Sequence, residues 1–105
     1  MPSEERRQHE RQKTWRVEVK VASPEAFRAS YLRDVSSGGL FVRSARPLPA
    51  GTRVVVQFSV ANRTATLPGA VVRVEAGAGF GVRFDTLIPE QQAAIAALIA
   101  EHQDR

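Results

Sequence analysis

The stretch that decides the fold is TRVVVQFSV, residues 52–60, in which large apolar side chains recur at every second position. Successive side chains of an extended strand point to opposite faces, so this spacing separates an apolar face from a mixed one. The mixed face includes Gln57 and Ser59. A strand that packs one face on a core and leaves the other in solvent has this pattern. The residues of the apolar face are Val54, Val56, Phe58 and Val60.

The same period of two appears in two segments nearer the N-terminus. In WRVEVKVA, residues 15–22, apolar residues alternate with charged ones. After a short turn that contains proline, FRASYLRDVS at residues 27–36 alternates imperfectly, because Leu32 falls among polar residues. Asp34 and Ser36 fall on the face that we expect to point outward. The face that we assign to the core carries Phe27, Ala29, Tyr31, Arg33 and Val35.

Three further segments lie toward the C-terminus. TATLPGAVVRVE, residues 64–75, predicts a long strand, and Pro68–Gly69 predicts a bulge or an edge position because proline cannot donate to a central ladder. FGVRF, residues 80–84, predicts a strand with its aromatic residues inward. The segment at about 88–103 predicts a helix, because alanine is abundant and Pro89 suits a first helical position. Its expected apolar stripe consists of Ile88, Gln92, Ile95, Leu98 and Ile99.

About six short strands, joined by turns with no helix between them, predict antiparallel pairing rather than β-α-β units. Closing such a sheet into a small barrel removes its exposed edges. A chain of 105 residues is long enough for one packed core. We therefore expect an all-β fold with one C-terminal helix: a single barrel domain over residues 15–105, preceded by a flexible basic arm at residues 1–14.

The composition limits the possible functions. The chain has no cysteine, which excludes a disulfide framework, a thiolate metal site and a thiol nucleophile. Neither a signal peptide nor an apolar run of about 20 residues is found, so we expect a cytoplasmic protein without a membrane span. The net charge is +4, with a cluster of basic residues before the first strand. That cluster is either a solvated leader or a site for an anionic ligand.

Catalysis finds no support in the sequence. His9 and His102 lack partners at a metal-ligand spacing, which argues against a metal site. Ser36 is not within the G-x-S-x-G turn that exposes a nucleophilic serine. Asp34 and Asp85 would form an acid–base pair only if the fold brought them together. We therefore expect a protein that is not an enzyme and has neither a metal nor a cofactor.

The segment DVSSGG, residues 34–39, interrupts the strand pattern with small polar groups, and two interpretations remain open. As a turn, Asp34 and Ser36 would cap local backbone amides, and Gly38 or Gly39 would adopt a positive φ. As a site, the carboxylate and the hydroxyl would accept hydrogen bonds from the edge of a guanine, while arginines would contact its other edge and the phosphates. Gly39 would then permit close approach of a ligand.

Two short motifs together resemble the signature of PilZ domains, which is R-x-x-x-R followed by [D/N]-x-S-x-x-G. RQHER supplies Arg7 and Arg11, and DVSSGG supplies Asp34, Ser36 and Gly39. Each half is weak alone, because R-x-x-x-R occurs often by chance in an arginine-rich chain, but the two in this order are far more specific. The resemblance extends over nearly the whole chain, through GGLFV, LPAGTRVVVQFSV, GFGVRF and the terminal helix.

The resemblance implies a six-stranded antiparallel barrel with a C-terminal helix that binds cyclic diguanylate (cyclic di-GMP), the bacterial second messenger of motility and biofilm signalling. By this resemblance, Arg7 and Arg11 would clamp guanine and phosphate from a flexible N-terminal arm that folds over the ligand. Asp34 and Ser36 would contact guanine and its linked phosphate, and Gly39 would allow the close approach.

The resemblance also suggests an auxiliary phosphate contact for Arg6 and an effector protein that senses the bound state. The main alternative is a PilZ-like adaptor that acts in motility or pilus function without binding the nucleotide, although the intact signature argues against it. Binding of single-stranded nucleic acid is a second alternative, and it would need exposed aromatic platforms. The chain has few aromatic residues, and the pattern turns Phe58, Phe80 and Phe84 inward. Trp15 fits either the core or a stacking contact with guanine.

Overall fold

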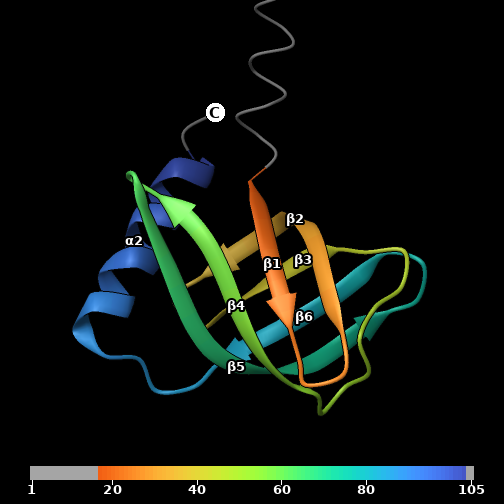
Figure 1. Cartoon of the computed structure of the whole chain (residues 1–105). Coiled ribbons are helices and arrows are strands. Elements are labelled where there is room, and N and C mark those ends of the chain that lie inside the picture. Colours follow the sequence, from red (N-terminus) through yellow and green to blue (C-terminus); the bar gives the residue numbers. More distant parts are fainter. Residues whose placement is uncertain (1–16, 104–105) are drawn as a thin grey trace, which may run out of the picture.

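The computed structural model describes residues 17–103, which form a closed barrel of six antiparallel strands and one helix (Figure 1). Around the barrel the order of the strands is β1-β2-β3-β6-β5-β4. This arrangement confirms the predicted fold: an antiparallel six-stranded barrel followed by a C-terminal helix. The elements are β1 (Glu18–Ala22), β2 (Phe27–Ser36), β3 (Gly39–Arg43), β4 (Arg53–Val60), β5 (Arg63–Glu75), β6 (Gly79–Phe84) and α2 (Pro89–Gln103).

The core fills the inside of the barrel with the inward residues of every strand. β4 alternates strictly between exposed and buried residues, as its sequence predicts. Burying a valine, leucine or phenylalanine side chain stabilises a fold by about 1.5–3 kcal/mol, so this interior dominates the stability of the barrel. The most deeply buried side chains of the strands are Phe80, Leu67, Val19, Val21, Val42, Val56 and Val71.

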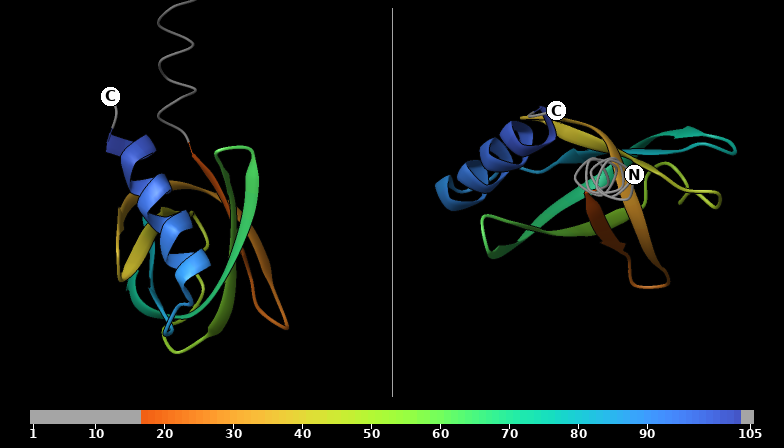
Figure 2. Two further views of the ribbon diagram at one scale, coloured as in Figure 1. Left: turned by 90° about the vertical axis from the view of Figure 1, so that its left-hand side faces the viewer. Right: turned by 90° about the horizontal axis from the view of Figure 1, so that it is seen from above.

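Helix α2 packs against one side of the barrel, beside the β4–β5 hairpin, and contacts β2, β4 and β5 (Figure 2). Ile95 and Leu98 are buried in the core, which confirms the centre of the predicted stripe. The first residue of the predicted stripe, Ile88, does not belong to it. Ile88 is 56% exposed and precedes the helix, where its backbone amide donates to the Gln91 side chain at 3.0 Å. That contact is a capping interaction, in which a third-position side chain reaches back over the helix start.

The prediction of which face of β2 points into the core is wrong for the first half of the strand. Ser30 and Leu32 point into the barrel, whereas Phe27 is 57% exposed. The reason is a β-bulge: Leu32 pairs with Val42 and Asp34 pairs with Phe41, so Arg33 is an extra residue. After the bulge the alternation changes parity, and Asp34 and Ser36 are exposed on the outer face as predicted.

The bulge expected at Pro68–Gly69 does not occur, whereas the edge position expected as its alternative is found on the β6 side of Pro68. Both residues are paired with β4, and the irregularity of β5 lies between Val71 and Arg73 instead. The Pro68 carbonyl accepts a hydrogen bond from the Asp85 amide, one residue beyond the end of β6. The backbone nitrogen and oxygen of a strand residue point to the same side. The nitrogen of Pro68, which has no hydrogen to donate, therefore faces a place where the neighbouring strand has already ended.

Candidate functional site

Four neighbouring strands, β2, β3, β6 and β5, carry a groove on the outside of the barrel, with a volume of about 410 Å³. We call it the outer groove. Strand register assembles it from distant segments: Asp34 is opposite Phe41, Phe41 is opposite Gly81, and Gly81 is opposite Arg73. A parallel row begins at Ser36, which is opposite Gly39 and, across β3, Arg83. The polar and aromatic residues of the groove are Asp34, Ser36, Phe41, Arg73 and Arg83.

The floor of the outer groove is the ring of Phe41, which points outward and yet is only 5% exposed. The ring lies over Gly79 and Gly81 on β6, because a Cβ at Gly79 would come within 2.9 Å of it and one at Gly81 within 3.4 Å. Two guanidinium groups cover its other side. The Arg33 group is 3.9 Å from the ring centroid and the Arg73 group 5.1 Å, both within cation–π range.

A network of ion pairs connects two residues that line the groove, Asp34 and Arg73, through Arg33 and Glu75. Arg33 Nε donates to Asp34 Oδ2 at 3.0 Å, and Arg33 Nη1 donates to Glu75 Oε1 at 3.3 Å. Arg73 Nη2 donates to Glu75 Oε2 at 2.7 Å. The hydrogen bond from Arg73 is the main reason that the pKa of Glu75 lies below its ordinary value, with Arg33 adding to the effect. The bond to Asp34 likewise raises the pKa of Arg33.

Ser36 braces the β2–β3 turn and also faces the groove. Its Oγ accepts from the Gly38 amide at 3.3 Å and donates to the Gly39 carbonyl at 3.4 Å, so the predicted cap at this position is present. Neither Gly38 nor Gly39 has the positive φ that the turn interpretation expected. Glycine at position 39 serves close packing instead, because a Cβ there would overlap the Val82 carbonyl oxygen of β6.

Of the predicted site residues, Asp34, Ser36 and Gly39 all line the outer groove. Arg6, Arg7 and Arg11, like Trp15, lie outside the described residues, and so does the predicted arm at residues 1–14. The described chain begins next to the groove: the amide of Leu32 donates to the carbonyl of Val17 at 2.8 Å. Residue 17 is therefore hydrogen-bonded to β2 only two positions before Asp34.

The alternative acid–base pair is not assembled. Asp85 follows the end of β6 and is four residues after Gly81, which is in the same cross-strand row as Asp34; four extended residues span about 13 Å. Its carboxylate is ion-paired with Arg53 instead. Residues 17–103 contain no group of three potential metal ligands and no helix long and apolar enough to cross a membrane. His102 Nε2 donates to the carbonyl of Arg33 at 3.1 Å, and no hydrogen-bond partner of its buried Nδ1 is found in the described part of the chain.

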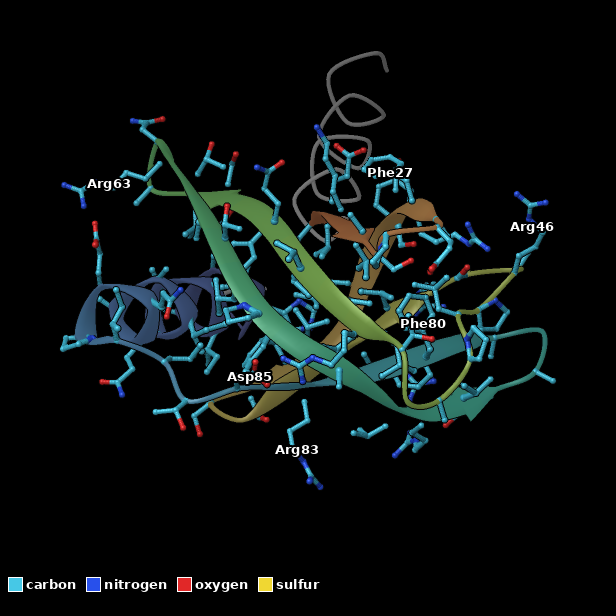
Figure 3. The ribbon with its side chains drawn as sticks, turned by 60° about the horizontal axis from the view of Figure 1, so that its bottom comes forward. Phe27, Arg46, Arg63, Phe80, Arg83 and Asp85 are labelled. Atoms are coloured by element: carbon cyan, nitrogen blue, oxygen red, sulfur yellow. The ribbon has the colours of Figure 1, made fainter. Side chains whose placement is uncertain are left out.

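Sequence reasoning missed Phe41, Arg73 and Arg83. The alternation of FGVRF does turn Arg83 outward, and Figure 3 shows its side chain projecting away from the barrel, on the side opposite Phe27. What the sequence does not contain is the partner of each strand. Only the pairing of β6 with both β3 and β5 places these residues beside DVSSGG.

A family model described as PilZ domain matches residues 5–101. The match spans nearly the whole chain, including the arginine pair and DVSSGG, so the chain belongs to the PilZ domain family. PilZ domains are in general non-catalytic receptor domains for cyclic di-GMP.

Nine chains of known structure match this fold. One is the crystal structure of the PilZ domain of CeSA from a cellulose-synthesizing bacterium, with a TM-score of 0.66 and 22% sequence identity. The alignment covers 80% of this chain and 89% of that one, and at this identity the likeness concerns the fold alone. No curated protein matches the sequence.

Proposed function

We propose that this chain is a non-catalytic receptor domain that binds cyclic di-GMP in the outer groove. The observation that carries the proposal is the gathering of Asp34, Ser36 and Gly39 along one groove with Arg73 and Arg83 across from them. Membership of a family whose domains are in general cyclic di-GMP receptors supports it further.

The chemistry of the groove matches the ligand. A carboxylate such as that of Asp34 accepts two parallel hydrogen bonds, which is what the N1–H and N2–H₂ groups of guanine offer. Arg83 is exposed in the groove, and a guanidinium group forms bidentate contacts with phosphodiesters and with the O6/N7 edge of guanine. The hydroxyl of Ser36 supplies a neutral contact beside them.

The position of Val17 supports the predicted role of Arg7 and Arg11. Neighbouring strands lie about 4.8 Å apart, so the groove measures about 14 Å from β2 to β5. Arg11 precedes Val17 by six residues, which span about 20 Å when extended. An arm that leaves the barrel beside Leu32 is therefore long enough for Arg11, and for the more distant Arg7 and Arg6, to reach a ligand anywhere in the groove. We expect binding to draw this arm onto the barrel and so create a surface that an effector protein senses.

Titration calorimetry with cyclic di-GMP tests the proposal. The wild-type protein should saturate at a fixed stoichiometry. Arg11→Ala should weaken the affinity about ten-fold or more, because it removes at least one charge-assisted contact. The matched control is Arg63→Ala, which removes an exposed arginine from the β4–β5 hairpin.

Two results would contradict the proposal. The adaptor alternative predicts no saturable heat with cyclic di-GMP. Binding of single-stranded nucleic acid predicts tighter binding of an oligonucleotide than of the dinucleotide, with an affinity that falls steeply as salt is added.

A further inference from the structure

Asp34 carries an exposed carboxylate, with 68% of its side chain accessible, and the contact that restrains it comes from the preceding residue. Arg33 Nε donates to its Oδ2 at 3.0 Å. We propose that Arg33 is a positioning residue that holds the Asp34 carboxylate in the orientation needed to accept the edge of a guanine. This inference rests on the proposed function, because it assigns Arg33 a role in the recognition of the same ligand.

Arg33 is placed for this role by the β-bulge. Strict alternation after Leu32 would turn residue 33 to the outside and residue 34 to the inside of the barrel. The extra residue lets Arg33 and Asp34 both lie on the outer face, because pairing resumes at Asp34 opposite the outward-pointing Phe41. Neighbouring positions of a regular strand would not bring these two side chains together.

Arg33 is itself restrained on three sides. It bonds to Asp34 on β2, to Glu75 on β5, and its guanidinium lies 3.9 Å from the centroid of the Phe41 ring on β3. Glu75 is held in turn by Arg73 Nη2 at 2.7 Å. A long side chain that is fixed by three strands provides a rigid support for a neighbour that would otherwise move freely among rotamers.

The charges of the network favour a supporting role over a direct contact with phosphate. Arg33 and Arg73 are balanced by Asp34 and Glu75, so the four groups together carry no net charge. A carboxylate has about four lone-pair sites on its two oxygens, and a single bond from Arg33 Nε uses one of them. Asp34 therefore keeps the capacity to accept both N–H groups of a guanine while Arg33 holds it.

The test is a double-mutant cycle measured by titration calorimetry with cyclic di-GMP, using Arg33→Ala, Asp34→Ala and the double variant. Arg33→Ala should weaken the affinity about three- to ten-fold, because the Asp34 side chain, no longer held, must then be ordered when the ligand binds. In the Asp34→Ala background the same substitution should change the affinity less than about two-fold, because a positioning residue has nothing left to position. The matched control is again Arg63→Ala, which also removes one positive charge.

A second readout uses cyclic di-inosine monophosphate, whose bases lack the 2-amino group of guanine. The wild-type protein should prefer cyclic di-GMP over this analogue, and this preference should be smaller in Arg33→Ala, as in Asp34→Ala. A general loss of stability would instead weaken the binding of both ligands equally. Glu75→Gln keeps Arg33 and Asp34 but weakens the anchor of Arg33, so it should show a smaller shift of the same kind. Thermal melts identify any variant that is unfolded at the temperature of the titration.

The outcomes separate the two levels of the proposal. If the wild-type protein gives no saturable heat with cyclic di-GMP, the proposed function is overturned, and the role of Arg33 with it. If the wild type binds and Arg33→Ala has no effect, or has an equal effect with and without Asp34, only the positioning role is overturned. An equal effect in both backgrounds would mean that Arg33 contacts the nucleotide directly.

Discussion

The outer face over β2, β3, β6 and β5 is built differently from the outer face over β1 and β4. On the first face, three outward positions of β3 and β6 are glycines, and a phenylalanine lies flat across two of them beneath two guanidinium groups. On the second, Val55 of β4 is 44% exposed opposite Ala22 of β1, and Phe27, at the start of β2 on the other side of Ala22, is 57% exposed. The strands of both faces belong to one barrel, so the difference comes from the outward side chains. A groove forms where the Cβ atoms are missing. The three glycines are Gly39, Gly79 and Gly81.

The largest expected effect comes from filling the groove face at its tightest point. In Gly39→Ala the new Cβ would overlap the Val82 carbonyl oxygen, so β3 and β6 must separate. We expect a loss of stability of about 1–3 kcal/mol, as for other overpacked sites, together with loss of ligand binding. Gly38→Ala is the matched control, since a Cβ there would meet nothing within 4 Å. Equal melting temperatures for the two variants would contradict the close packing of these strands.

A smaller effect, confined to binding, is expected for Asp34→Ala. If Asp34 accepts two hydrogen bonds from guanine as proposed, removing its carboxylate should weaken the affinity for cyclic di-GMP about 10- to 100-fold. Stability should change by less than about 1 kcal/mol, because the side chain is exposed. Asp85→Ala is the control, because Asp85 is also paired with an arginine but lies outside the groove. A variant that binds normally but melts early would favour the turn interpretation of DVSSGG.

Comparing Arg83 with Lys20 sharpens the difference between the faces. Both are exposed, positively charged residues within strands, one on the groove face and one on β1. Arg83→Ala should weaken the affinity for cyclic di-GMP about ten-fold through loss of one charge-assisted contact. Lys20→Ala should have little effect on this affinity. Titrations at two salt concentrations separate a direct contact from long-range attraction, because salt screens the latter. Equal losses in the two variants would mean that net charge alone drives the interaction.

The smallest expected effect is the pH dependence of the network at Glu75. Because Arg73 and Arg33 hold its pKa below the ordinary value, the ionised form stabilises the folded state, fully so above the pKa of an unfolded glutamate. This contribution is lost as the pH falls below about 4.3 and through the lowered folded-state pKa. The difference in melting temperature between the wild type and Glu75→Gln should therefore shrink between pH 6 and pH 3. A difference that does not vary with pH would show that the ion pairs contribute nothing.

The sequence predicts the inward half of the molecule better than the outward half. In β4 each second residue is apolar, and all four predicted core residues are buried. Burial leaves this strong periodic trace because one face of the strand must be apolar throughout. In β2 the same rule gives the wrong face before the bulge, because an extra residue changes the parity and nothing in FRASYLRDVS marks Arg33 as unpaired.

The candidate site is predictable only where it is contiguous in the chain. Asp34, Ser36 and Gly39 lie within six consecutive residues, from the end of β2 to the start of β3, and they form one recognisable motif. Arg73 and Arg83 reach the same groove through the register of β5, β6 and β3, which depends on long-range pairing. Phe41 gives no signal either: alternation turns it outward between Leu40 and Val42, and nothing in GGLFV shows that an outward phenylalanine would be covered. It is buried outside, beneath arginines.

The hydrogen bond from His102 to the carbonyl of Arg33 links the last turn of α2 to a residue whose side chain contacts Asp34 in the groove. The residue whose side chain supports Asp34 on the outside of the barrel is held through its backbone by the helix. Coupling between two sites is reciprocal, so whatever free energy a ligand adds to the docking of that turn, the docked turn adds to the affinity for the ligand. The single unpaired residue of β2 thus connects the two regions, the groove through its side chain and the helix through its backbone carbonyl.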